Sequence, residues 1–199
     1  MPARKILLAQ LEVNQDANEL VVDYAKGQGA RVVLNPAPIH AVSSEFLCKA
    51  DVITPNEVEA SALSGIPIKT PDDALRAARI LMDKGVKSVV ITLGKQGVLA
   101  VTENQSRLFR NYDVKVVDST GAGDAFNGGL VTALSEGKKP AGSLRLCQCS
   151  IQFGGHPDGH RALYAHPPGN RRFSGSPSQR CGLASVFIFT RPRLKEESL

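Results

Sequence analysis

The chain has 199 residues and a formal net charge of +5, and 42% of its residues are apolar. This apolar content can build a core, and the length suits one or two domains. The basic residues are dispersed and form no patch with aromatic residues, which argues against a nucleic-acid partner. No apolar run reaches the roughly 18 residues of a membrane span. The start shows no signal-peptide pattern, so we expect a cytoplasmic protein without a membrane segment.

Apolar runs typical of strands alternate with segments of helical spacing from the start of the chain. The expected strands are 6–9, 31–35, 51–53, 86–92 and 114–117, with a hairpin formed by 98–102 and 106–110. The expected helices are 17–26, 57–64, 71–84 and 125–134, with a short helix or loop at 46–48. This alternation predicts the α/β fold class, with a mainly parallel sheet flanked by helices.

Two local expectations concern single side chains. In the helix at 17–26, the spacing places Leu20, Val21 and Tyr24 on one face. Cys48 is expected to be a small buried residue, because free cysteines are commonly buried. The cysteines indicate no disulfide framework, which agrees with a cytoplasmic location.

Polar residues stand directly after several of the expected strands. They are Asn35, Asn56, Thr92 and Asp124. Because ligands of parallel sheets bind beyond the carboxyl ends of the strands, we expect these side chains to share one rim and to form a ligand site there.

A glycine-rich turn between an apolar run and a helix start provides the sharpest signal. Gly121 and Gly123 allow the backbone to approach a phosphate closely, and the amides and dipole of the first helical turn favour an anion. Asp124 places a carboxylate beside this anion site. It is either a helix cap or a general base that deprotonates a hydroxyl aimed at a phosphoryl group.

Several segments, in order, resemble motifs of the ribokinase-like carbohydrate kinases. They are 8–12 (L-A-Q-L-E), 35–38 (N-P-A-P), 51–60 (D-V-I-T-P-N-E-V-E-A), 89–97 (V-V-I-T-L-G-K-Q-G) and 118–124 (D-S-T-G-A-G-D). Ser119 departs from the usual threonine of the last motif. The resemblance implies a ribokinase-like fold, incomplete here, and an ATP-dependent transfer of phosphate to the primary hydroxyl of D-ribose that gives ribose 5-phosphate.

The resemblance also implies roles for the residues of the last motif. Asp124 matches the catalytic base on the sugar hydroxyl, and so it also contacts the substrate. Gly121, Ala122 and Gly123 match the anion hole for the transferred phosphate. Asp118 matches a position near a monovalent-cation site, for K⁺ by family.

The nucleotide side of the site is implied by two other motifs. Asn56 and Glu59 match the residues that organise Mg²⁺, phosphate and water, without serving as direct ligands. Read from their own chemistry, the two residues also suit a helix N-cap with an acid in the first turn. Thr92, Gly94 and Gly97 match positions that lie against ATP.

Both ends of the chain depart from the family pattern. Residues 1–145 resemble the C-terminal nucleotide-binding and catalytic part of longer proteins, so we expect a chain truncated at its N-terminus. Glu12 is then a surviving sugar contact, and the residues that choose the sugar are missing. We expect 146–199 to be an aberrant, disordered tail, with an exposed, β-prone apolar run at 186–190.

A shift of reading frame accounts for this tail. The codons allowed for Cys147 to Phe173, read one nucleotide later, can spell A-N-A-A-F-N-S-V-V-T-R-M-G-T-A-P-S-M-P-T-R-R-E-I-D-A. That peptide resembles the family's C-terminal helix and loops. Cys147 and Cys149, with two nearby histidines, are then not metal ligands, and their spacing is tighter than that of structural zinc sites.

Three functions remain open on the sequence. The first is a ribokinase, of which this truncated chain has negligible activity alone because phosphoryl transfer depends on positioning. The second is a kinase for another sugar or a nucleoside. The third is a non-catalytic nucleotide-binding remnant. A sugar and ATP are the expected partners, and the oligomeric state is undetermined.

Overall fold

The fold is built on one sheet, and the computed structural model describes residues 5–40, 42–110, 121–138 and 186–188. The strands are β1 (Ile6–Gln10), β2 (Arg31–Asn35), β3 (Val52–Ile53), β4 (Ser88–Thr92), β5 (Val98–Thr102), β6 (Gln105–Phe109) and β7 (Val186–Ile188). Their order is β6-β5-β4-β3-β2-β1-β7. Parallel pairing joins β4, β3, β2, β1 and β7, each to the next. The hairpin strand β5 pairs antiparallel with both β4 and β6. The predicted hairpin therefore forms an antiparallel edge of a mainly parallel sheet.

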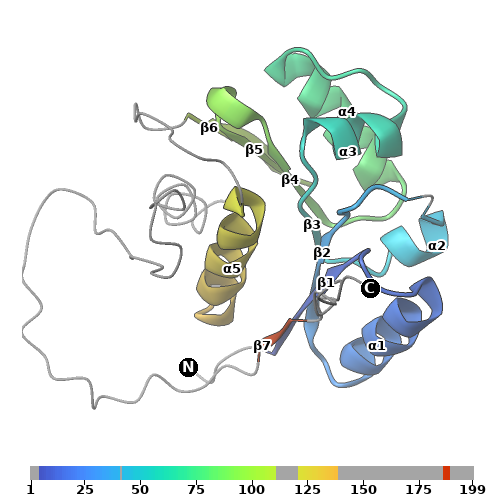
Figure 1. Cartoon of the computed structure of the whole chain (residues 1–199). Coiled ribbons are helices and arrows are strands. Elements are labelled where there is room, and N and C mark those ends of the chain that lie inside the picture. Colours follow the sequence, from blue (N-terminus) through green and yellow to red (C-terminus); the bar gives the residue numbers. More distant parts are fainter. Residues whose placement is uncertain (1–4, 41, 111–120, 139–185, 189–199) are drawn as a thin grey trace, which may run out of the picture.

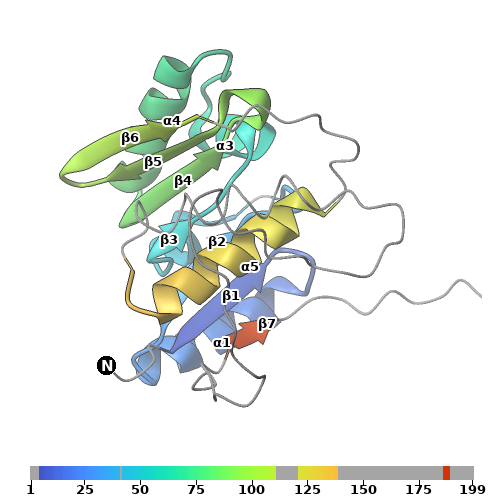
Figure 2. The same cartoon turned by 90° about the vertical axis from the view of Figure 1, so that its left-hand side faces the viewer.

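Helices cover both faces of the sheet. They are α1 (Gln15–Gly27), α2 (Ser44–Leu47), α3 (Glu57–Ser64), α4 (Pro71–Asp83) and α5 (Ala122–Ser135), with a short 3₁₀ helix, η1 (Gly94–Gln96). Figure 1 shows α1 to α4 on one side of the sheet and α5 on the other, and Figure 2 shows α5 in front of the sheet, running along the direction of β1. The predicted α/β class with helices flanking the sheet is confirmed. The expected strand at 114–117 lies outside the described residues.

Strand alternation divides the core into two layers. Leu7 and Ala9 of β1 belong to the apolar cluster on the side of α1 to α4. Ile6 and Leu8 belong to a second cluster, which includes Phe126 of α5. Because successive side chains point to opposite faces, the same parity fixes which face receives the last residue of each strand. This rule decides which polar side chains reach the site below.

Two helices start at capping boxes. Asn56 accepts a hydrogen bond from the amide of Glu59, and the Glu59 carboxylate accepts one from the amide of Asn56. Thr70 and Asp73 form the same arrangement at α4. Reciprocal bonds of this kind satisfy amides that a helix start leaves without partners. At its other end α3 stops at Gly65, whose φ of 78° lies in the left-handed region that glycine favours.

An ion-pair cluster lies at the amino-terminal end of β3, around Asp51. The carboxylate of Asp51 accepts hydrogen bonds from Lys26 at 3.0 Å, from Lys87 at 2.8 Å and from the amide of Val32 at 2.9 Å. Burial alone would raise the pKa of Asp51, but these three bonds outweigh it and hold that pKa below its usual value. The cluster ties α1, β2 and the residue before β4 to one carboxylate.

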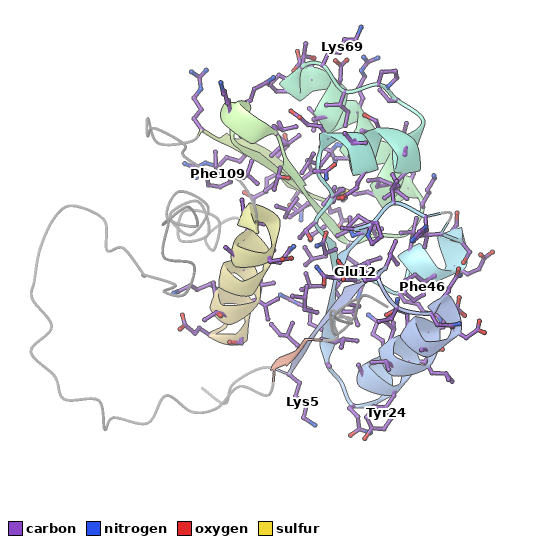
Figure 3. The ribbon with its side chains drawn as sticks, in the orientation of Figure 1. Lys5, Glu12, Tyr24, Phe46, Lys69 and Phe109 are labelled. Carbon is purple, nitrogen blue, oxygen red and sulfur yellow. The ribbon has the colours of Figure 1, made fainter. Side chains whose placement is uncertain are left out.

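The face of α1 that carries Leu20 and Tyr24 is exposed. Leu20 and Tyr24 are 73% and 72% exposed, and Figure 3 shows Tyr24 on the outer side of the helix. The buried positions of α1 are Asn18 and Val22. The Asn18 amide donates to the backbone carbonyl of Gln10 at 2.9 Å, so a satisfied polar side chain takes a place in the core.

Two further local expectations meet a different structure. Cys48, expected to be buried, is exposed at the end of α2, because the buried positions there go to the larger Phe46 and Leu47. Within the run at 186–190, Val186–Ile188 forms β7 and pairs in parallel with β1. Among the described residues, no helix is long and apolar enough to cross a membrane.

Candidate active site

A cleft of about 210 Å³ lies beyond the carboxyl ends of β1 to β4, on the side of α5. Strand ends, the loops after them and the first turns of α3 and α5 all contribute. Its lining residues are Gln10, Glu12, Asn35, Ala37, Thr54, Asn56, Glu59, Thr92, Gly121, Gly123, Asp124, Phe126 and Asn127. Figure 3 labels Glu12 just beyond the end of β1. The position agrees with the rule that open α/β sheets bind ligands at this edge.

Strand parity explains why the floor of the cleft is polar. Leu8, Val33, Val52 and Val90 pack toward α5, one from each parallel strand. The residue two positions later in each strand or its continuation points the same way. These residues are Gln10, Asn35, Thr54 and Thr92, and each of them lines the cleft. The layer of side chains under α5 is therefore apolar along the strands and becomes polar at their carboxyl ends, where it forms the floor of the cleft.

The first turn of α5 is built to receive an anion. Gly121 is its N-cap with φ of 73°, and among the described residues no side chain caps this helix end. A methyl group added at Gly123 would meet nothing within 4 Å, so the backbone there is open to an approaching group. Helix-start amides without a side-chain acceptor, together with the dipole of this 14-residue helix, favour a phosphate.

Hydrogen bonds from two strand ends hold α5 over the cleft. The side-chain amide of Gln10 donates to Asp124 Oδ1 at 3.3 Å. The Thr54 hydroxyl donates to Asn127 Oδ1 at 2.7 Å, and both residues are buried. Asp124 and Asn127 lie one turn apart on α5, so these contacts fix the rotation of its first turn above β1 and β3.

The capping box of α3 also forms part of the cleft wall. Asn56 donates to both oxygens of the Glu59 carboxylate, from its backbone at 2.9 Å and from its side-chain amide at 2.8 Å. Burial raises the pKa of Glu59 and outweighs the lowering by these bonds. Thr92 is linked to this wall because its amide donates to the carbonyl of Pro55 at 3.0 Å. Asn56 and Glu59 therefore cap a helix and also line the cleft, and their role in organising magnesium and phosphate stays a prediction.

The donor set suits magnesium held through water. Among the described residues, no three His, Cys, Asp or Glu side chains gather as a metal cluster. Glu59 offers one carboxylate with both oxygens already in hydrogen bonds, and Asp124 lines the same cleft. Mg²⁺ commonly keeps several waters and binds through one or two carboxylates and substrate phosphates. Asn56, Glu59 and the α5 helix start therefore fit a magnesium–nucleotide phosphate group.

The structure brings most of the predicted site residues together and leaves some apart. Those that line the cleft are Glu12, Asn56, Glu59, Thr92, Gly121, Gly123 and Asp124. Ala122, Gly94 and Gly97 are not among its lining residues. Ala122 is the first residue of α5, and Gly94 begins η1 directly after β4. Asp118, the expected cation residue, lies outside the described residues.

Gly97 has a structural requirement of its own. Its φ is 111°, and a Cβ at this position would stand 2.0 Å from the backbone oxygen of Phe109. The residue joins η1 to β5 where the β6 backbone passes closely. Glycine is therefore required here by packing, whatever lies in the cleft.

Sequence reasoning missed three of the lining residues that carry hydrogen bonds. They are Gln10, Thr54 and Asn127. A signal for the two strand-end residues was present, because each stands two positions after an apolar residue that packs toward α5. Asn127 stands three residues after Asp124, on the same helical face.

The fold and the cleft are those of an α/β protein with a ligand site beyond the strand ends, and comparison with known proteins identifies the family. The chain belongs to the pfkB family of carbohydrate kinases, whose model matches residues 4–150. It is similar to the ribokinase of Haemophilus influenzae, with 44% identity over 144 residues that make up 72% of this chain and 47% of the relative. It is also similar to a deoxyribokinase of Salmonella typhi, with 38% identity over 62% of this chain and 41% of the relative.

A solved structure of similar fold is the Arabidopsis thaliana ribokinase complexed with ribose and ATP. It has a TM-score of 0.71 and 30% identity, over 74% of this chain and 48% of that chain. The Thermotoga maritima ribokinase has a TM-score of 0.67 and 36% identity, over 75% and 50%. The predicted ribokinase-like family is confirmed, and the chain spans about half the length of these relatives.

Proposed function

We propose that this chain is the phosphoryl-transfer part of an ATP-dependent sugar kinase that phosphorylates the primary hydroxyl of D-ribose. One observation carries the proposal: the Asp124 carboxylate and the uncapped start of α5 face the same cleft as Glu12, Asn56 and Glu59. A carboxylate beside an anion site suits a base that acts on a hydroxyl next to a phosphate. The similarity to ribokinases supports ribose as the acceptor.

Each residue of the cleft has a definite task in this proposal. Asp124 accepts the proton of the sugar hydroxyl. The amides at the start of α5, from Gly121 to Gly123, hold the negative charge of the phosphate. Glu12, at the β1 side, contacts the sugar. Because Asp124 is exposed in the structure, a hydroxyl can reach it from the open side of the cleft.

Other residues of the cleft act on the nucleotide in this proposal. Asn56 and Glu59 orient the waters around the metal, and Thr92 at the end of β4 lies beside the nucleotide. When bound, ATP supplies the phosphoryl group and Mg²⁺ neutralises charge on its phosphates. By the family resemblance, a K⁺ near Asp118 would order the start of α5, and we expect its site to be incomplete in this chain because the altered tail should carry most of its ligands. Glycines 94 and 97 act through the η1 turn that follows Thr92 rather than through the cleft lining.

A second acceptor has a specific observation in its favour. The similar proteins include a deoxyribokinase at 38% identity, close to the identity of some ribokinases. Glu12 and Asp124 are the sugar contacts that we assign among the cleft residues, and neither is assigned to the 2-hydroxyl that distinguishes ribose from 2-deoxyribose. Ribose is the proposed substrate, and 2-deoxyribose is the competitor to assay beside it.

The test uses a chimera in which residues 4–145, the part of the family match that precedes the proposed frame shift, replace the matching segment of the H. influenzae ribokinase. We expect ADP formation that depends on ribose and falls at least about 100-fold in the Asp124→Asn variant, because general-base catalysis contributes on that order. A chimera that folds but forms no ADP with ribose or 2-deoxyribose would refute the proposal. The 199-residue chain, assayed in parallel, is expected to show negligible turnover, because it matches only about half of its relatives.

We also propose that residues 146–199 are read out of frame. The family match ends at residue 150, close to the expected shift near Leu146 and Cys147. The coding DNA decides the point. Synonymous codons from Cys147 to Phe173 that spell the shifted peptide support the proposal, and any set of codons that does not spell it ends the idea.

A further inference from the structure

We propose that Gln10 is a positioning residue that holds the Asp124 carboxylate in one rotamer, with one oxygen turned toward the acceptor hydroxyl. The inference rests on the proposed function of Asp124 as the base. It concerns a different residue, on a different element, from those assigned above.

The contact is specific in its chemistry. Gln10 Nε2 lies 3.3 Å from Asp124 Oδ1. An ionised carboxylate only accepts hydrogen bonds, so the nitrogen of the Gln10 amide, and not its oxygen, must face Asp124. This distance is at the long end for such a bond, and contacts of catalytic groups commonly shorten when substrate binds.

Gln10 is itself held firmly. It is the last residue of β1, paired with Asn35 of β2, and only 6% exposed. Its backbone oxygen accepts a hydrogen bond from the buried side-chain amide of Asn18 at 2.9 Å. Helix α1 therefore supports this strand end from the face of the sheet opposite α5. A buried side chain on a sheet strand, braced in this way, holds its partner more accurately than a loop residue would.

Among the described residues, Asp124 by contrast is held by one side-chain hydrogen bond. It is exposed, in the first turn of α5. Among the described residues, its Oδ1 accepts the Gln10 bond and its Oδ2 accepts none. One oxygen is therefore fixed to the sheet and the other remains available to a hydroxyl. Without Gln10, the carboxylate would rotate among its rotamers and face the acceptor for only part of the time.

The primary test measures the rotamer in the full 199-residue chain by NMR. We expect unequal Hα–Hβ couplings for Asp124, which indicate a single χ1 rotamer, and averaged couplings in Gln10→Met, which keeps the length of the side chain and removes the donor. Thr70→Ala, which removes the cap of α4 far from the cleft, serves as the stability control and should leave the Asp124 couplings unchanged. Averaged couplings in the wild type, or unequal couplings in Gln10→Met, would overturn the proposal.

The second test measures the consequence for turnover in the chimera described above. We expect Gln10→Met to lower kcat about tenfold with little change in the KM for ATP, because the loss falls on the orientation of the base. Gln10→Glu should lower kcat further, because a carboxylate then faces a carboxylate. An unchanged kcat in Gln10→Met, in a chimera that Asp124→Asn inactivates, would refute positioning while the proposed function stands. An inactive wild-type chimera would refute the proposed function, and the NMR couplings would still decide whether Gln10 orients Asp124.

Discussion

Replacing Gly97 with alanine should destabilise the fold strongly, for a reason that the backbone geometry makes explicit. The new Cβ would lie 2.0 Å from the oxygen and 2.9 Å from the carbonyl carbon of Phe109. These are backbone atoms of β6, which is paired with β5 across five register positions, so they cannot move without disturbing the hairpin. The φ of 111° adds strain for any residue with a side chain.

The magnitude follows from two separate costs. With ψ of −140° beside φ of 111°, Gly97 has a backbone conformation almost confined to glycine, which costs an alanine about 1 to 3 kcal/mol. Forcing a methyl group into a packed site costs about 1 to 3 kcal/mol. We therefore expect Gly97→Ala to lose about 2 to 6 kcal/mol of unfolding free energy, a large share of the about 5 to 15 kcal/mol of a typical domain. Gly29→Ala is the matched control, because Gly29 has φ of 70° and open space around its Cβ position. It should lose only the about 1 to 2 kcal/mol due to the backbone.

Urea unfolding followed by far-UV circular dichroism measures both variants, since the chain contains no tryptophan. With a slope of about 1 to 3 kcal/mol per molar urea, the unfolding midpoint of Gly97→Ala should lie below that of Gly29→Ala by about 1 M. Equal midpoints for the two variants would show that β6 does not approach Gly97 as closely as described, and the argument for the glycine would fail.

Three further substitutions test other parts of the fold. Asp51→Asn should cost about 2 kcal/mol at pH 7, because Lys26 and Lys87 lose their shared carboxylate. The pKa of Asp51 is lowered in the folded state from 3.8, so this contribution is present above that pH and disappears as the pH falls through the folded value. Urea titrations at pH 7 and pH 3 should show the gap between wild type and variant shrinking, and a gap that grows toward low pH contradicts the sign. Thr70→Ala should cost about 1 kcal/mol in the same assay through the lost cap, and no change would mean that the capping box is not formed in solution. Phe126→Ala should cost about 3 to 5 kcal/mol because Phe126 is fully buried between α5 and the sheet, whereas a loss below about 1 kcal/mol would show that α5 does not pack there.

The sequence predicted the elements well where local signals and burial agree. The strand Arg31–Asn35 and the helix Glu57–Ser64 have the expected bounds, because an apolar run in one case and a cap with a terminal glycine in the other leave little choice. The predicted start of α5 was late by three residues: the helix begins at Ala122, inside the glycine-rich turn. Glycine lowers helix propensity, so the sequence pattern alone placed these residues in the turn.

The inward face of α1 could not be derived from apolar spacing. Leu20 and Tyr24 suggested one face, yet the helix buries Asn18, whose partner is a backbone oxygen of β1. A tertiary hydrogen bond of this kind leaves no pattern in the helix itself. Cys48 was misplaced for a related reason, because only the packing of α2 shows which of its neighbouring residues fill the core.

The residues of the candidate site that belong to recognisable motifs could be predicted from the sequence, whereas the residues that hydrogen-bond to α5 could not. Asp124, Asn56 and Glu59 stand in recognisable segments, and the structure places all three around one cleft. Gln10 and Thr54 stand at strand ends, where only the parity of the sheet shows that they face α5. The role assigned to Asp118 remains a prediction because this residue lies outside the described part of the chain. The same holds for the tail except Val186–Ile188, which forms β7.

The most direct test of the central claim is an NMR titration of the ¹⁵N-labelled 199-residue chain with Mg²⁺ and ATP. If the cleft is a nucleotide-phosphate site, the largest shifts should appear at the amides of Gly121 and Gly123, with smaller ones at Asn56 and Thr92. Shifts confined to the separate cavity lined by Ile39, Leu63 and Lys84, or an absence of shifts at saturating ATP, would contradict the claim.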